Sequence, residues 1–284
     1  GADTAVTYNF VLRATDATSQ VGTQSYTVTI NPRDRAIART PPTVLIVYDL
    51  NEGPIYYPGY GYYYPGPNYP ENGGFDVSVG GLAQTVAARE SSLGFLTQVV
   101  TSYSLLNQFT REQMNTFAHI WDLGYRTQIT GTIRDKYNLY LQDGGAIFLL
   151  GENVYFNIRN QSICDLVGSI GGGSTGIRYD TAGLNTIGAT TASEFLLANS
   201  TAGITFYAPN FFSSYGTGTP VANTGLGPSA VMWKTGSLSN ARAGAVVSVL
   251  DINFLLNPQY GANYGGAQWQ PWFVDNLSII LNRK

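Results

Sequence analysis

Four continuous apolar segments recur in the chain after residue 42, and they predict buried strands of one parallel sheet. A strand that helices cover on both faces carries apolar residues without alternation, whereas a strand with one wet face alternates. The four segments are residues 43–49, 118–123, 146–151 and 244–250. Residues 95–103 fit one further strand, and residues 230–233 fit a late one. We therefore expect the first four segments to lie side by side.

Between these segments, apolar residues recur at helical spacing. The clearest series is Ile129, Ile133, Tyr137 and Leu141, which forms one stripe of an amphipathic helix. Further helices are expected at 81–90, around 163–170 and around 273–280, and Thr110 with Gln113 fits a capping box. Strands that alternate with helices predict an α/β fold, with a mostly parallel sheet and helices on both faces. Residues 174–228 show no period and are expected to be irregular.

The first thirty residues carry a different, alternating pattern that predicts a β-hairpin. One face of it holds Val6, Tyr8, Phe10, Leu12, Tyr26, Val28 and Ile30. Two strands alone are marginally stable in water, so this hairpin must pack on something else. A proline-rich linker follows it. We therefore divide the chain into a hairpin arm at 1–32, a linker at 33–42 and an α/β domain at 43–284.

The composition of the chain narrows the classes of partner that it could bind. Only 12% of the residues are charged and the net charge is −3, so no basic surface indicates nucleic acid, and no polybasic segment indicates an anionic membrane. No apolar run has the length of a transmembrane helix, so membrane insertion is not expected. Few charges and 20 tyrosines are common in secreted proteins, which predicts an extracellular or cell-surface location. The start at Gly1 indicates a processed product or a segment of a longer precursor.

Cysteine and histidine are nearly absent. Cys164 is the single cysteine, which excludes an intrachain disulfide and a cysteine-based zinc site. His119 is the single histidine and leaves little for metal chemistry, so we expect neither a metal nor a cofactor. Cys164 lies beside Ile163 on a predicted helix, where a buried and unreactive thiol is the ordinary case.

Polar side chains follow four of the predicted strands. In doubly wound sheets, ligands bind beyond the carboxyl ends of the strands. The residues at these ends are Asp49, then Asp122 with Tyr125, then Glu152 with Asn153, then Asp251 with Asn253. Together they could bind a cation or a polyhydroxylated ligand. The alternative, which we favour, is that Asp and Asn cap the turns and helices that follow strands.

A segment rich in Tyr, Pro and Gly at 53–70 leaves the end of the first strand of the domain. Pro and Gly disfavour regular structure there, whereas tyrosine offers large contact area with a polar tip. Two interpretations stay open. The segment is an assembly loop, with Tyr57, Tyr60 and Tyr63 as candidate contacts, or it is a lid that packs on its own domain.

Residues 119–125, 140–153 and 246–255, with 273–277, resemble the class I glutamine-amidotransferase-like superfamily. This resemblance implies a flavodoxin-like sheet for the α/β domain. It also implies a cysteine nucleophile at the turn after residue 151 and a histidine later in the chain. Glu152 and Asn153 occupy that turn instead, and His119 precedes it. The resemblance therefore implies a scaffold without its catalytic pair.

The hairpin sequence at 8–17 and 24–30 resembles the last two strands of bacterial immunoglobulin-like or cadherin-like repeats, without the remaining strands. We hypothesise a non-catalytic secreted or cell-surface structural and interaction protein, whose arm links copies into a filament or lattice. Its partners would be further copies, and surface polysaccharide or other surface proteins. Candidate assembly residues are Tyr8, Phe10, Tyr26, Val28, Tyr57, Tyr60 and Tyr63.

The alternative hypothesis is a hydrolase or carbohydrate-binding module that uses the acidic strand ends. Glu152 as a general acid would want a carboxylate partner, for which Asp122 is a candidate. A deep pocket lined by Asp49, Glu152 and Asp251 would support this alternative. A site filled by tyrosines would support the structural role.

Overall fold

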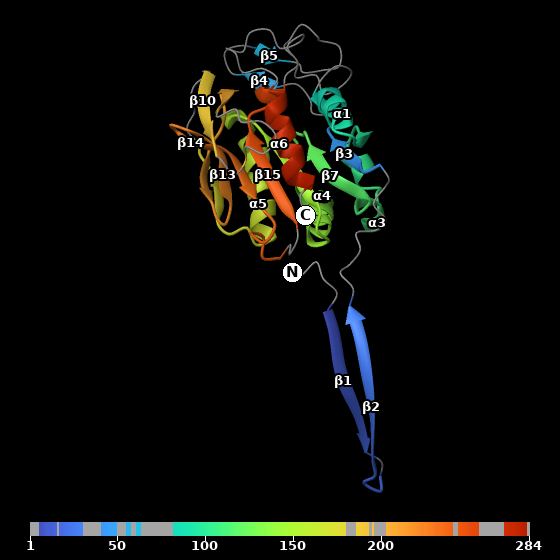
Figure 1. Ribbon diagram of the computed structural model, residues 1–284. Coiled ribbons are helices and arrows are strands. Elements are labelled where there is room, and N and C mark those ends of the chain that lie inside the picture. The colour runs from blue at the N-terminus through green and yellow to red at the C-terminus, as the bar shows by residue number, and fades with distance from the viewer. Residues whose placement is uncertain are drawn as a thin grey trace.

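A nine-stranded mixed sheet forms the centre of the α/β domain (Figure 1). The computed structural model describes residues 6–15, 17–30, 41–49, 55–57, 61–63, 82–179, 186–192, 195, 203–240, 244–255 and 270–282. In spatial order the strands are β11 (Gly203–Tyr207), β10 (Thr186–Thr191), β13 (Thr219–Thr224), β14 (Gly227–Trp233), β15 (Ala245–Leu250), β8 (Ala146–Gly151), β7 (Phe117–Asp122), β3 (Thr43–Val47) and β6 (Leu96–Val100).

The five strands from β15 to β6 run parallel to one another. Every residue of β3, β8 and β15 is buried, as expected for strands covered on both faces. The prediction that segments 43–49, 118–123, 146–151 and 244–250 lie side by side in one parallel arrangement is therefore confirmed.

The other four strands, from β14 to β11, pair antiparallel, so the sheet is mixed. The expectation of a mostly parallel sheet is accurate for the half from β15 to β6 alone. The expectation that 174–228 is irregular is wrong, because β10, β11 and β13 lie there, with β9 (Thr175–Ile177) and β12 (Phe212–Tyr215) in a separate small sheet. These strands are rich in Thr, Gly and Asn, and β13 buries only small or single apolar residues such as Val221 and Ala222. They therefore show no apolar run.

Helices cover both faces of the sheet. Helix α1 (Leu82–Ser92) packs on β3, and α6 (Pro271–Asn282) packs on β7, β8 and β15, on the face that carries Val44 and Ile46 of β3. Helices α4 (Gly131–Gln142) and α5 (Asn157–Ser169) pack on the opposite face with Leu45 and Val47, together with α2 (Tyr103–Leu106) and α3 (Arg111–Met114). The side chains of successive residues in one strand thus pack into the hydrophobic clusters on opposite faces of the sheet. None of the described helices is long and apolar enough to cross a membrane.

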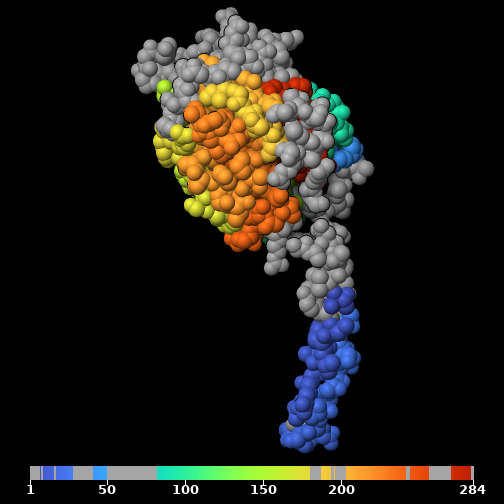
Figure 2. Space-filling view, turned by 60° about the vertical axis from the view of Figure 1, so that its left-hand side comes forward, coloured from blue at the N-terminus to red at the C-terminus, as the bar shows by residue number. Residues whose placement is uncertain are grey.

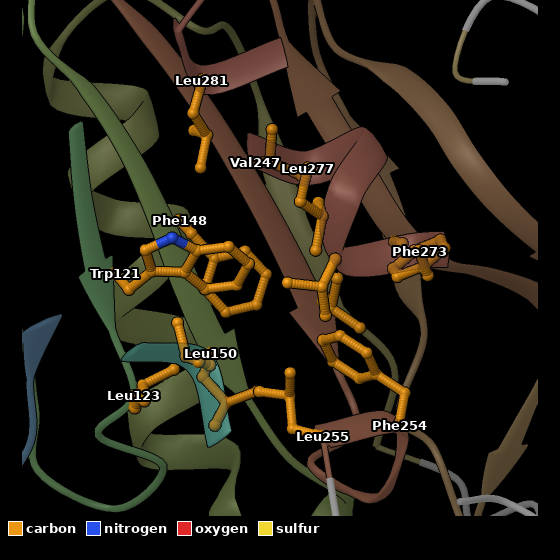
Figure 3. Packing of buried hydrophobic residues seen from close by; sticks show 14 of the residues in the cluster. Trp121, Leu123, Phe148, Leu150, Val247, Phe254, Leu255, Phe273, Leu277 and Leu281 are labelled. Carbon is orange, nitrogen blue, oxygen red and sulfur yellow. The ribbon is translucent and has the colours of Figure 1, made fainter. Parts of the chain in front are cut away.

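The core beneath α6 contains a group of aromatic side chains among Leu and Val residues (Figure 3). The rings of Trp121 and Phe148 lie 4.5 Å apart, and Phe254 contacts Phe148 at 6.2 Å and Phe273 at 5.3 Å. Leu277 and Leu281 of α6 point into the same region. The predicted helix stripes therefore meet the predicted strands, and the expected capping box at Thr110 and Gln113 is present.

The predicted N-terminal hairpin is confirmed. Strands β1 (Val6–Thr15) and β2 (Val21–Ile30) pair antiparallel, with Phe10 opposite Tyr26 and their rings stacked at 5.6 Å. Figures 1 and 2 both show this hairpin apart from the α/β domain. Among the described strands, β1 and β2 pair only with each other. The outer edge of each hairpin strand thus pairs with no other strand in the described part of the chain.

Several candidate assembly side chains lie outside the described part of the chain. Tyr57 and Tyr63 belong to a short pair of strands, β4 (Ile55–Tyr57) and β5 (Gly61–Tyr63), of which the backbone alone is described. The same holds for Tyr8 and Val28 in the arm, whereas Tyr60 is outside the described residues.

Candidate functional site

Two carboxyl groups meet at the carboxyl ends of β8 and β15. These strands are parallel neighbours with Gly151 opposite Leu250, so the next residues, Glu152 and Asp251, emerge at the same edge. Both are buried. Oε2 of Glu152 accepts a hydrogen bond from the Ile252 backbone N–H at 3.0 Å, which ties the two strand ends together. The sequence therefore predicted these two site residues as neighbours correctly.

Burial controls the protonation of this pair. It raises the pKa of Glu152 to about 8. Burial, and then the charge of Glu152, also raise the pKa of Asp251 well above its ordinary value. Two adjacent carboxyls in a water-poor site resist carrying two negative charges, and their protons belong to the pair. At neutral pH the site therefore holds a proton that an exposed glutamate would have released.

Most oxygens of the pair are already engaged. Asp251 accepts the backbone N–H of Tyr207 at 2.6 Å and that of Asn253 at 2.7 Å. Oε1 of Glu152 accepts Nδ2 of Asn153 at 2.8 Å. These bonds fix both side chains in place.

Asn153 and Asn253 follow the ends of β8 and β15, and only Asn153 caps a helix, as the capping interpretation expects. Oδ1 of Asn153 accepts the Tyr155 N–H at 3.0 Å and opens the short helix η2 (Val154–Phe156). Asn253 begins the short helix η4 (Asn253–Leu255), which the Asp251 side chain caps. Nδ2 of Asn253 is buried and has no hydrogen-bond partner in the described part of the chain.

Asn160 holds the turn after β8 and was not singled out for this role by sequence reasoning. Its Oδ1 accepts the Glu152 N–H at 3.0 Å, and its Nδ2 donates to the Glu152 carbonyl at 2.5 Å. A side chain at Gly151 would come within 2.5 Å of both Asn160 and Leu250, so this turn requires glycine. The turn at Glu152, where the family resemblance implies a nucleophile, is thus held by hydrogen bonds to the Asn160 side chain.

Asp122 belongs to a different network. It pairs with the buried Arg159 at 3.0 Å and accepts the hydroxyls of Tyr103 at 2.6 Å and Tyr137 at 2.9 Å. Burial and the neighbouring Asp122 raise the pKa of Tyr137 well above its ordinary value. The hypothesis that Asp122 partners Glu152 is therefore wrong, because the neighbouring carboxyl of Glu152 is Asp251.

Arg159 was missed, although a signal existed. It lies four residues before Ile163, on the stripe of α5 that continues to Val167, so a helical projection places a guanidinium among core residues. A buried Arg needs an acid, and Asp122 is that acid.

Tyr125 and Asp49 are the two remaining predicted site residues. Tyr125 is buried and packs edge-on against Phe156, with ring centroids 5.4 Å apart. Asp49 follows β3 and is half-buried. In the described part of the chain, no three His, Cys, Asp or Glu residues gather in a way that could hold a metal ion.

A further buried acid, Glu90 of α1, was also missed. Its Oε1 accepts Trp121 Nε1 at 2.7 Å and the Ser278 hydroxyl, and His119 Nε2 lies 3.1 Å away. Burial alone would raise the pKa of Glu90, but His119 and the hydrogen bonds hold it below its ordinary value. This cluster joins α1, β7 and α6. Cys164 is buried as predicted, and burial raises its pKa to about 12.

A groove of about 290 Å³ lies away from the strand ends, between α3 and α4. Arg111, Met114, Lys136 and Tyr140 are among its lining residues. Arg111 there binds Asp143 through two hydrogen bonds of 2.6 Å. None of the predicted site residues lines this groove.

Comparisons with known proteins identify the fold. No family model and no curated protein matches the chain. Among solved structures, the chain is similar to the mmIFT52 N-terminal domain, with 12% identity and a TM-score of 0.52 over 85% of this chain and 98% of that one. It is also similar to two proteins of Salmonella typhimurium. The cytoplasmic protein STM1381 of strain LT2 is 11% identical, with a TM-score of 0.53 over 84% of this chain and 99% of that one. The cytoplasmic protein STM3548 is 12% identical, with a TM-score of 0.51 over 84% of this chain and 97% of that one. At these identities the likeness shows the fold alone.

The expected extracellular or cell-surface location is corrected by this comparison, because two of these structural neighbours are named cytoplasmic proteins. The structure also explains why composition was a poor guide. Tyr103, Tyr125, Tyr137 and Tyr140 are all buried in the domain. The high tyrosine content therefore reflects in part the packing of the core, which any cellular compartment permits.

Proposed function

We propose that the protein is a non-catalytic structural or interaction protein that self-assembles through its N-terminal arm, the β1–β2 hairpin. One observation carries this proposal. The apolar face of the arm is exposed, with 43% of Phe10, 56% of Leu12 and 44% of Tyr26 accessible to solvent. Covering these side chains stabilises an assembly by about 1 kcal/mol each, since roughly half of each remains to be buried.

The α/β domain supports a role without catalysis. In chain order, the parallel strands β6, β3, β7, β8 and β15 run 2-1-3-4-5 across the sheet, which is the order of flavodoxin-like folds. We therefore retain a flavodoxin-like core, and a relationship to the class I glutamine-amidotransferase-like superfamily, as proposals. The turn that would hold the nucleophile carries Glu152 and Asn153, both engaged in hydrogen bonds.

The geometry of the arm favours a polymer. A hairpin that leaves its own domain and binds another copy makes a head-to-tail contact, which propagates into a filament unless the rotation closes a ring. We therefore expect a filament or lattice.

The test compares the full chain with Phe10→Lys/Tyr26→Lys, which charges the apolar face. Ser25→Lys is the control, because Ser25 lies opposite Val11 on the other face of the same hairpin. Sedimentation velocity and negative-stain microscopy should show polymers for the natural chain and the control, and monomers for the double variant. Deletion of residues 1–32 should also give monomers. A natural chain that is monomeric at micromolar concentration would contradict the proposal.

A second candidate, a hydrolase or carbohydrate-binding module, is favoured by the carboxyl pair. Strongly perturbed acids gather at functional sites, and Glu152 has a pKa of about 8 beside Asp251. Nδ2 of Asn253 is buried and finds no partner among the described residues. The burial of all three side chains places this candidate second. A glycan array and chromogenic glycosides, tested with the natural chain and Glu152→Gln, decide it: binding or turnover that the variant loses would favour this candidate.

A further inference from the structure

The nine-stranded sheet has two edges, and the edge at β11 is already covered. The Thr205 carbonyl of β11 accepts Nε2 of Gln270 at 2.9 Å, and the Tyr207 N–H donates to Asp251 at 2.6 Å. Outward backbone groups of this strand therefore have partners within the domain. An incoming strand would have to displace them.

Among the described strands, none pairs with the outer edge of β6. The Leu96 N–H donates to the Pro42 carbonyl at 2.9 Å, and the Val100 carbonyl accepts the Tyr48 N–H at 3.0 Å, so both residues face β3. In a parallel pair alternate residues face the partner strand, so the backbone groups of Thr97 and Val99 face outward. No other described strand pairs with this side of β6.

Apolar side chains surround this edge. Leu96 is 53% exposed and Val99 is 40% exposed, and Leu93 and Leu105 nearby in the chain are exposed as well. The other large apolar side chains exposed in the described part of the domain are scattered over the chain: Leu139, Tyr155, Ile158, Tyr179 and Leu226. Four of nine thus fall within thirteen residues around β6. Edge strands are ordinarily protected by charge or proline, and β6 has neither.

We propose that the β6 edge is the acceptor site for the arm of a second copy of this chain. This inference rests on the proposed self-assembly and names the surface that receives the arm. The chemistry of the two surfaces matches. The arm offers two strand edges with exposed apolar residues, and its strands contain a single charged residue, Arg13. Strand addition supplies hydrogen bonds to Thr97 and Val99, while the apolar side chains cover one another.

The test uses two full-length variants that each lack one half of the contact. Val99→Pro removes an outward N–H and leaves the residues that bond β3 unchanged, while its arm stays intact. Val99→Thr is the matched control, because it keeps the N–H and strand preference. Phe10→Lys/Tyr26→Lys disables the arm and keeps the β6 edge. Circular dichroism verifies the fold, and Thr97→Lys/Val99→Lys replaces Val99→Pro if the proline variant does not fold.

In sedimentation velocity, each variant alone should be monomeric, and Val99→Thr should polymerise. A mixture of Val99→Pro with the arm variant should form a species of twice the monomer mass and nothing larger, because one intact arm meets one intact edge.

Two results overturn the acceptor site while self-assembly through the arm stands: Val99→Pro polymerises although the arm variant is monomeric, or the mixture stays monomeric although both variants alone are monomeric. If the natural chain is monomeric, or the arm variant still polymerises, both the acceptor site and the proposed function are wrong.

Discussion

Replacing Glu152 by Gln should change how the stability of the protein depends on pH. The carboxyl of Glu152 is buried beside Asp251, and its pKa is raised from 4.5 to about 8. Between these two values the folded state holds a proton that the unfolded chain has released. The free energy of unfolding must then fall as pH rises through this window. Glutamine carries no titrating proton, so the variant loses this contribution.

The magnitude follows from the pKa difference. The rise of the Glu152 pKa from 4.5 to about 8 corresponds to about 5 kcal/mol in full. The stabilising contribution of the neutral carboxyl is complete below pH 4.5 and disappears as pH rises to about 8. Between pH 5.5 and 7.5 the natural chain should therefore lose about 2 kcal/mol more than the variant. The variant also carries a constant cost of about 1–3 kcal/mol, since the glutamine oxygen can accept the bond from Asn153 or from Ile252, and the N–H2 group that faces the other donor cannot accept.

Urea denaturation at half-unit pH steps, followed by tryptophan fluorescence, measures both profiles. The quantity of interest is the difference in slope, which a constant cost does not affect. Glu112→Gln is the control, because Glu112 is an exposed glutamate of α3. Its profile should run parallel to that of the natural chain. Parallel profiles for the natural chain and Glu152→Gln would refute the reasoning that the carboxyl pair keeps a proton.

Two further predictions concern other buried groups. Arg159→Met should lower the free energy of unfolding by about 3–5 kcal/mol, because it leaves Asp122 buried without its counter-charge. In urea denaturation, the double variant Arg159→Met/Asp122→Asn should recover part of this loss. A double variant that loses as much stability as Arg159→Met, or more, would argue against the pairing of Arg159 with Asp122. Cys164 should react slowly with a thiol reagent at neutral pH in the native protein and completely in denaturant, since burial and a pKa of about 12 keep the thiolate scarce; rapid labelling of the native protein would contradict this.

The parallel half of the sheet could be predicted because its signals are local. Strands such as β8 and β15 are buried on both faces and show unbroken apolar runs, and α4 shows its stripe. In the antiparallel half, strands β10 and β13 have no such run. Strand β13 gains its place through pairing with β14, and its Thr, Pro and Asn residues give no period. Single-sequence patterns record the burial of large side chains, and the buried residues of β13 are small.

In the candidate site, too, some contacts could be predicted from the sequence and others could not. That Glu152 and Asp251 lie together follows from the shared edge of parallel strands. That Arg159 reaches Tyr103, 56 residues away, or that Glu90 receives Ser278, 188 residues away, depends on how helices dock across the sheet. Local spacing contains no information on such contacts. The buried charges on α1 and α5 were visible as charged residues on apolar stripes, but their partners were not.

Helix α6 also sets an order for folding during synthesis. Its residues, 271–282, follow all nine strands in the chain, and they cover the aromatic core of Trp121, Phe148 and Phe254 (Figure 3). Chains emerge from the ribosome N-terminus first. The sheet can therefore assemble while this apolar face is still uncovered, and the Glu90 cluster cannot close until Ser278 arrives. The aromatic side chains under α6 therefore stay uncovered until the last helix of the domain has been made.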